Sequence, residues 1–170
     1  ERREELERAI SLLQEAAARD PSYALAFAGL GEAYWRLYEL SKHQEFVELA
    51  RQNCRRALAL DDLLAPVYVT LGLISRGTGQ TESALDSFAR ALDRDPRNAD
   101  AMREQGRALA DAGRNEEAER AYQRALALRP SDWATYNYLG RMKVGEGRLE
   151  EAARDFEQVT LLAPDNPRGY

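Results

Sequence analysis

The chain has 170 residues, of which 44% are hydrophobic and 31% are charged, and its formal net charge is −5 at pH 7. This composition is typical of folded helical proteins and argues against disorder. The acidic balance argues against a nucleic-acid-binding role, because nucleic-acid-binding domains usually present a strongly basic surface.

The composition also argues against a disulfide-bonded, a metal-bound or a membrane-spanning structure. Cys54 is the only cysteine, which excludes an internal disulfide, and no group of Cys and His residues has the spacing of a zinc site. We therefore expect no metal and no cofactor. No apolar run approaches the roughly 20 residues that a membrane-spanning helix needs. Because the chain begins inside a helical pattern, without methionine or a signal peptide, we expect a piece of a longer protein, and we favour the cytoplasm as its compartment.

Three series of residues recur at a spacing of 34 positions. They are the prolines Pro96, Pro130 and Pro164, the alanines Ala84, Ala118 and Ala152, and the glycines Gly72, Gly106 and Gly140. A fixed period of this length indicates one supersecondary unit that is repeated along the chain, each copy relying on its neighbours to bury its apolar face. The sequence therefore predicts a repeat protein, which works through its surface rather than as a catalyst.

The first predicted element is a helix within residues 1–21, and it matches the second helix of a repeat whose first helix is missing. An extended repeat follows over residues 22–64. It holds seven residues more than the period allows, and seven residues make about two helical turns. We therefore expect each of its two helices to be one turn longer, with a bend at residues 40–43.

Regular repeats are predicted over residues 65–98, 99–132 and 133–166. In the second of these, a helix over 100–111 ends at a turn where Gly113 can adopt the left-handed conformation. The following helix, 116–128, ends before Pro130, and Ser131 and Asp132 then offer caps for the next helix. Its apolar face is formed by Ala118, Ala121, Tyr122, Ala125 and Leu126. Residues 167–170 are expected to start a further repeat, with Tyr170 at its aromatic position.

The helix, turn, helix unit resembles the tetratricopeptide repeat, whose pattern is aromatic, Leu, Gly, Tyr in the first helix and Ala, Phe, Ala, Pro in the second. In residues 133–166 the pattern falls on Tyr136, Leu139, Gly140, Ala152, Phe156, Val159 and Pro164. The resemblance implies an all-α fold, a right-handed α-solenoid of antiparallel helix pairs that forms one domain over nearly the whole chain. Ser75, Leu109 and Lys143 depart from it, since the family often has Tyr there.

The signature residues have a steric interpretation. We expect Gly72, Gly106 and Gly140 to let helices approach closely opposite Ala84, Ala118 and Ala152. The rings of Phe88, Tyr122 and Phe156 are expected to fill the space between repeats. Cys54 stands at the aromatic position of the extended repeat, which predicts a core residue rather than a reactive thiol.

The resemblance implies a concave groove lined by the first helices of the repeats. The positions that would face it are Glu32, Trp35, Arg36, Val69, Leu73, Arg76, Arg103, Arg107, Asp111, Asn137 and Arg141. Among them we predict a ligand site at Arg76, Arg103, Arg107, Asn137 and Arg141, in which the four arginines form a basic stripe. The alternative is that the arginines pair with Asp100, Glu104 and Asp111 on their own helices.

The predicted function is a noncatalytic scaffold that binds a peptide or a protein, and the arginines favour an acidic partner. His43, the only histidine, is expected to be a solvated loop residue, so nothing indicates an enzyme. The carboxylate clamp of chaperone-binding relatives is not reproduced, nor is the asparagine ladder of glycosyltransferase relatives, whose positions hold Gly29, Thr70, Glu104 and Tyr138.

Two further expectations remain open. The alternative function is a regulatory or sensory segment of a larger bacterial signalling enzyme, such as a serine/threonine kinase or a cyclase, because residues 24–35 are similar to arrays found beside such catalytic domains. Self-association through the open ends is also expected, because the last helix would present Phe156, Val159, Leu161 and Leu162 without a following helix to cover them.

Overall fold

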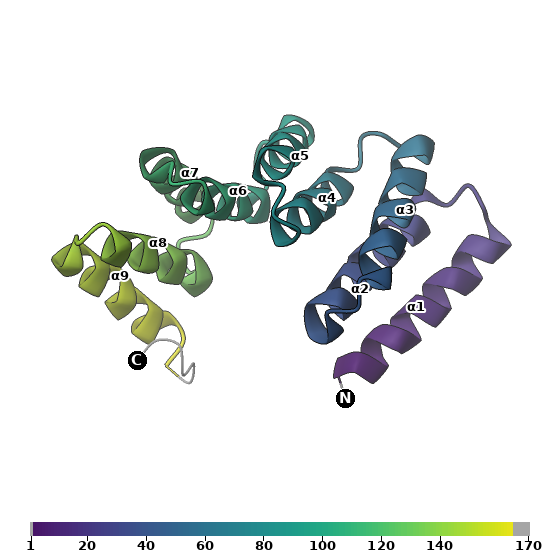
Figure 1. The fold of residues 1–170 in the computed structure, drawn as a ribbon, viewed down its shortest axis with the longest axis horizontal. Coiled ribbons are helices and arrows are strands. Elements are labelled where there is room, and N and C mark those ends of the chain that lie inside the picture. Colours follow the sequence, from purple (N-terminus) through teal and green to yellow (C-terminus); the bar gives the residue numbers. More distant parts are fainter. Residues whose placement is uncertain (1, 165–170) are drawn as a thin grey trace. The chain divides into compact units, whose positions relative to one another are not determined.

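The computed structural model describes residues 2–164, and all regular elements in this range are α-helices (Figure 1). They are α1 (Arg2–Arg19), α2 (Ala24–Ser41), α3 (Glu45–Leu60), α4 (Ala65–Gly77), α5 (Thr81–Arg94), α6 (Ala99–Asp111), α7 (Asn115–Leu128), α8 (Trp133–Gly145) and α9 (Leu149–Leu162). The predicted all-α fold is confirmed, and the helices expected over 100–111 and 116–128 begin within one residue of α6 and α7. The repeat start expected at 167–170, including Tyr170, lies outside the described residues.

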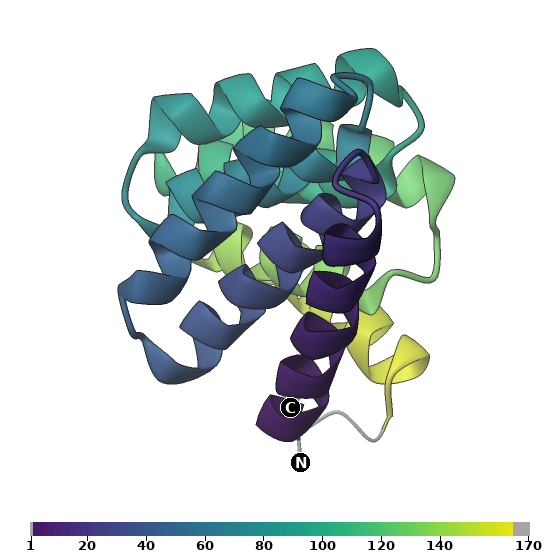
Figure 2. The same cartoon turned by 90° about the vertical axis from the view of Figure 1, so that its right-hand side faces the viewer.

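The chain divides into two compact units, residues 1–96 and 97–170. In the first unit, α2 packs against α3 and α4 against α5, while α1 packs on α2 and the pairs meet through α2, α3 and α4. In the second unit, α6 packs against α7 and α8 against α9, and the pairs meet through α6, α7 and α8. The helices of each pair are antiparallel (Figures 1 and 2). Each unit therefore places the first helices of two successive repeats against each other.

The extended repeat has longer helices, but the extra length is not shared equally as expected. The 18 residues of α2 exceed α4 by five, whereas the 16 residues of α3 exceed α5 by two. The lengthened α2 buries Leu37, and the ring of Phe46 on α3 stacks on Tyr34 at 6.2 Å between centroids. Apolar packing thus extends α2 up to Ser41, where Lys42 turns the chain with a positive φ of 59°.

The predicted turns are confirmed at the residue level. Gly113 has a φ of 74°, and Gly79 and Gly147 adopt the same left-handed conformation after α4 and α8. The side chain of Asp132 caps α8 by accepting a hydrogen bond from the backbone N–H of Ala134 at 3.2 Å. A glycine in the turn and a capping side chain before the helix therefore define where the repeats in this part of the chain begin and end.

The glycines of the first helices lie against the aromatic rings of the second helices. A Cβ atom at Gly106 would lie 2.7 Å from Cε1 of Tyr122, and one at Gly72 would lie 2.4 Å from Cε1 of Phe88. The ring of the second helix therefore lies directly on the glycine of its own repeat. Because glycine has no side chain, it leaves space between the two helices, and the ring fills this space. The two helices can therefore approach closely without a void.

The same contact explains Cys54 in the extended repeat. A Cβ atom at Gly31 would lie 2.5 Å from Sγ of Cys54, so the thiol takes the place of the ring. Cys54 is fully buried, and this burial raises the pKa of its thiol to about 12. The prediction of a core residue is confirmed, because a thiol that stays protonated and buried is a poor nucleophile.

The expected apolar end of the last helix is smaller than predicted. Val159 is fully buried, and Phe156 is half-buried with its ring against Gly140. Val159 lies on the face of α9 that also buries Ala152 and Asp155, at the three- to four-residue spacing of one helix side. Only Leu161 and Leu162 of the four predicted residues are exposed, with 72% and 37% of their surface accessible.

Candidate functional site

The predicted ligand residues fall on the first helices of both units. Arg103 and Arg107 lie on α6, Asn137 and Arg141 lie on α8, and these two helices pack together in the second unit. Arg76 lies in the last turn of α4 in the first unit and is half-buried. The four residues of the second unit can therefore be compared directly.

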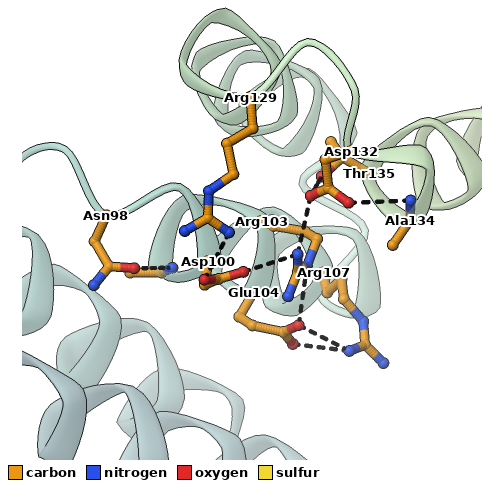
Figure 3. Close-up of polar contacts among 10 residues, drawn as sticks. Asn98, Asp100, Arg103, Glu104, Arg107, Arg129, Asp132, Ala134 and Thr135 are labelled. Carbon is orange, nitrogen blue, oxygen red and sulfur yellow. Dashed lines mark hydrogen bonds and ion pairs between the residues drawn. The ribbon is translucent and has the colours of Figure 1, made fainter. Parts of the chain in front are cut away.

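Arg103 lies at the centre of an ion-pair network (Figure 3). Its Nη1 is 2.9 Å from a carboxylate oxygen of Asp100 and 2.9 Å from one of Asp132, and its Nε is 3.4 Å from Glu104. Burial lowers the pKa of Arg103, but the hydrogen bond to Asp132 and the three carboxylates outweigh burial and hold the pKa above its usual value. Since Asp132 also caps α8, Arg103 links α6 to the start of the next repeat.

Arg107 contacts one carboxylate and one ring. Its Nη1 donates hydrogen bonds to both oxygens of Glu104, at 3.1 and 2.8 Å (Figure 3). Its guanidinium lies over the ring of Tyr138 on α8, with Cζ 4.2 Å from the ring centroid. Glu104 is buried, so the ion pair is largely shielded from water. Nε and Nη2 of Arg107 make no hydrogen bond to any residue in the described range.

The two α8 residues differ in exposure. Asn137 is buried, whereas Arg141 is exposed. Arg141 has no hydrogen bond or ion pair with residues 2–164. The alternative in which arginines pair on their own helices thus describes the contacts of Arg103 with Asp100 and of Arg107 with Glu104, but not the environment of Arg141.

Tyr138 belongs to this cluster, and sequence reasoning missed it. In the sequence, Tyr138 is noticeable only as a position at which the asparagine ladder is absent. The repeat register contains a usable signal, since Arg107 and Arg141 occupy equivalent positions 34 residues apart and Tyr138 lies one helical turn before Arg141. A ring at that position of one repeat lies within reach of an arginine from the preceding repeat, as the Arg107–Tyr138 contact demonstrates.

In the first unit, the predicted groove position Trp35 is not available to a ligand. The indole is buried, packs on Tyr38 at 5.0 Å between ring centroids, and lies against Gly77, where a Cβ atom would be 2.4 Å from Cη2. The large apolar ring is buried between α2 and α4 because Gly77 leaves room for it. The prediction that Trp35 faces a groove is wrong.

A second charged cluster in the second unit is internal. Lys143, whose side chain is 9% exposed, lies 2.8 Å from Asp155 and within 4 Å of Glu119 and Glu151. Arg148 donates hydrogen bonds to Glu119 and Glu151, and the bonds from Arg148 hold the pKa of both carboxyls below the usual value. The cluster connects α7, α8 and α9, so it joins two repeats.

Two other predicted features are placed by the structure. His43 is exposed in the turn between α2 and α3, which confirms it as a loop residue. Within residues 2–164, every helix is too short or too polar to cross a membrane.

The way the helices pack defines the class of protein to which this chain belongs. Two-helix units with a glycine under the ring of the second helix, in which both helices of one repeat pack on the first helix of the next, are the architecture of an α-helical repeat protein. Residues 69–132 and 103–167 match the family model described as "Tetratricopeptide repeat", and together they cover more than half of the chain. The chain belongs to the tetratricopeptide repeat family.

The chain is also similar to known proteins in sequence and in structure. The probable biofilm formation methyltransferase WspC of Pseudomonas aeruginosa is 37% identical over 75 residues, which are 44% of this chain and only 17% of WspC. The thermophilic tetratricopeptide repeat protein TTC0263 of Thermus thermophilus is 23% identical, with a TM-score of 0.79 over 95% of this chain and 84% of that one.

A second similar structure contains a bound peptide. It is the first tetratricopeptide domain of Spaghetti (RPAP3) bound to the HSP90 peptide SRMEEVD, and it is 28% identical. Its TM-score is 0.59, over 62% of this chain and 85% of that one. The fold of the present chain is therefore that of tetratricopeptide repeat proteins, one of which holds a short acidic peptide.

Proposed function

We propose that this chain is a noncatalytic scaffold that binds a peptide or partner protein on the exposed face of its first helices. The observation that carries the proposal is the packing of first helix against first helix in each unit, α2 against α4 and α6 against α8. This packing places their outward side chains in adjacent rows, so that one extended ligand can contact two repeats at once.

The predicted contact residues differ in how accessible they are to a ligand. Arg141 is the most accessible, and Arg107 keeps two donor nitrogens unused by the described residues. Arg103 and Asn137 are better suited to support the face, because Arg103 is held by three carboxylates and Asn137 is buried. Arg76 is the predicted contact of the first unit.

An acidic partner is the finer part of the proposal. Arginine recognises carboxylates with good geometry, because its planar donors match the two oxygens. The 28% identical relative that holds the peptide SRMEEVD supports the same direction. A cytoplasmic location stays a prediction.

The test combines peptide selection with NMR mapping. Peptides are selected on the immobilised chain from a random display library, and the enriched peptide is titrated into ¹⁵N-labelled protein. We expect the largest amide shift changes in the first helices α4, α6 and α8. Shift changes confined to the second helices α3, α5, α7 and α9 would contradict the proposal, and so would the absence of any enriched peptide.

The second candidate is a regulatory segment of a larger bacterial enzyme. The observation in its favour is the similarity to WspC, which is named as a methyltransferase and is much longer than the matched segment. The sequence of the full polypeptide tests this candidate. If a catalytic domain accompanies the repeats, deletion of residues 1–170 is expected to change its activity or its regulation, and unchanged activity and regulation would exclude this role.

A further inference from the structure

Three groups on α6 and α8 have hydrogen-bond donors without acceptors among the described residues. They are Nε and Nη2 of Arg107, the hydroxyl of Tyr138, and the guanidinium of Arg141. All three side chains are at least partly accessible to solvent. This part of the surface therefore offers three donor groups, two of which are permanent cations.

The three groups lie on two helices that pack together. Arg107 lies on the ring of Tyr138, with 4.2 Å between Cζ and the ring centroid. Arg141 follows Tyr138 by three positions in α8, and residues three apart are neighbours on a helix surface. The guanidinium of Arg107 thus contacts the ring of Tyr138, and a second arginine from the next repeat follows about one helical turn further along α8.

The position of Arg107 is fixed before any ligand arrives. Glu104 accepts two hydrogen bonds from Nη1, and the ring of Tyr138 supports the guanidinium plane from α8. A side chain held at two points loses little conformational entropy when it binds, which favours binding. The carboxylate of Glu104 leaves Nε and Nη2 available on Arg107.

We propose that Arg107, Tyr138 and Arg141 form a recognition site for one internal Asp or Glu side chain of a bound peptide. This inference rests on the proposed function and names the chemistry of the partner at one point. A carboxylate suits the site better than a phosphate, because the nearby charge of Glu104 repels a dianion more strongly than a monoanion. Arg103 is not part of the site, because it pairs with Asp132, the residue that caps α8.

The test uses two blocked peptides and fluorescence anisotropy. Both are fluorescein-labelled, N-terminally capped and C-terminally amidated. One alternates Ala and Glu, and its twin alternates Ala and Gln, so that side-chain carboxylates are the only anions that differ. We expect the Glu peptide to bind at least about tenfold more tightly than the Gln peptide, and we expect this difference to shrink as salt is added.

Matched variants show which residues cause the difference in affinity between the two peptides. Arg141→Gln is expected to reduce the affinity for the Glu peptide about tenfold, and Tyr138→Phe, which keeps the ring under Arg107, a few fold. Arg124→Gln is the control, because Arg124 is an exposed arginine on α7 that makes no hydrogen bond or ion pair with the described residues. It removes the same charge and is expected to leave the affinity unchanged. Circular dichroism confirms the folding of each variant.

Each other outcome overturns the inference in a recognisable way. Equal affinity of the two peptides, no binding of the Glu peptide, or equal losses in Arg141→Gln and Arg124→Gln would reject the carboxylate site. The proposed function would still stand if the selected peptide shifts first-helix amides. Tighter binding of a twin with phosphoserine in place of Glu would reject the carboxylate in favour of a phosphate.

Discussion

At the residue scale, the glycine under each ring is the contact that defines the repeat. The sequence predicted the glycines and the rings correctly, because both recur every 34 residues. It did not predict that they touch, because the direction of a ring depends on how two helices cross. Gly31 with Cys54 and Gly106 with Tyr122 show that the same contact accepts a thiol or a ring.

This contact predicts the effect of adding one methyl group. Gly106→Ala places Cβ 2.7 Å from Cε1 of Tyr122, so the ring must shift, and we expect a loss of about 1–3 kcal/mol in the free energy of unfolding. Gly145→Ala is the control, because no atom lies within 4 Å of its Cβ position. Urea denaturation measures both. Equal stabilities of the two variants would show that the ring moves without cost.

A second residue-scale prediction concerns Asp132. Burial raises its pKa, but hydrogen bonds from Thr135 and Arg103 outweigh burial and hold the pKa below its usual value of 3.8. Because the folded pKa is depressed, this carboxylate stabilises the fold fully above about pH 4, and the contribution is lost as the pH falls through the folded pKa.

Asp132→Asn tests this contribution. The amide can still cap α8 but loses the charge that faces Arg103, so we expect a loss of about 1–3 kcal/mol at pH 7 and a smaller loss near pH 3. Asp93→Asn serves as a control, because Asp93 is exposed. Urea denaturation over this pH range gives the comparison, and a loss that does not depend on pH would attribute the effect to geometry alone.

At the scale of elements, the helices were predictable because their signals are local. Gly113, Pro130 and Asp132 each act within a few residues, so the ends of α6, α7 and the start of α8 agree with the sequence. The length of α2 was not predictable from the insertion alone. How seven extra residues are shared depends on which of them find apolar partners, as Leu37 does.

The charged cluster around Lys143 joins two repeats, and we expect its ion pairs to contribute to the free energy of unfolding. Lys143→Met removes the cation from Asp155, and an unpaired buried carboxylate is expected to cost about 3–5 kcal/mol. The double variant Lys143→Met/Asp155→Leu removes both charges, so we expect most of the stability to return. Thermal and urea denaturation of the two variants, with Arg124→Met as a surface control, measure this coupling. A double variant as unstable as the single one would contradict the ion-pair explanation.

At the scale of the whole molecule, the sequence identified the family but not the ligand-binding residues. The family follows from a period that recurs along the chain. The roles of the arginines depend on contacts between repeats, such as those of Arg103 with Asp132 and of Arg107 with Tyr138. These contacts separate an arginine that supports the fold from one that is accessible, and composition contains no such information.

Self-association is the prediction that belongs to this scale. Leu161 and Leu162 remain exposed at the end of α9, but Val159 is buried, so the apolar surface is smaller than the sequence indicated. We therefore expect weak, concentration-dependent association in light scattering, since small interfaces are short-lived. Leu161→Glu is expected to abolish it, because a charge cannot enter an apolar contact without cost. Leu149→Glu places the same charge at the start of α9, where Leu149 is 64% exposed, and is expected to leave association unchanged. A wild-type chain that stays monomeric at high concentration would exclude this contact, and equal effects of both variants would assign it to net charge rather than to the end of α9.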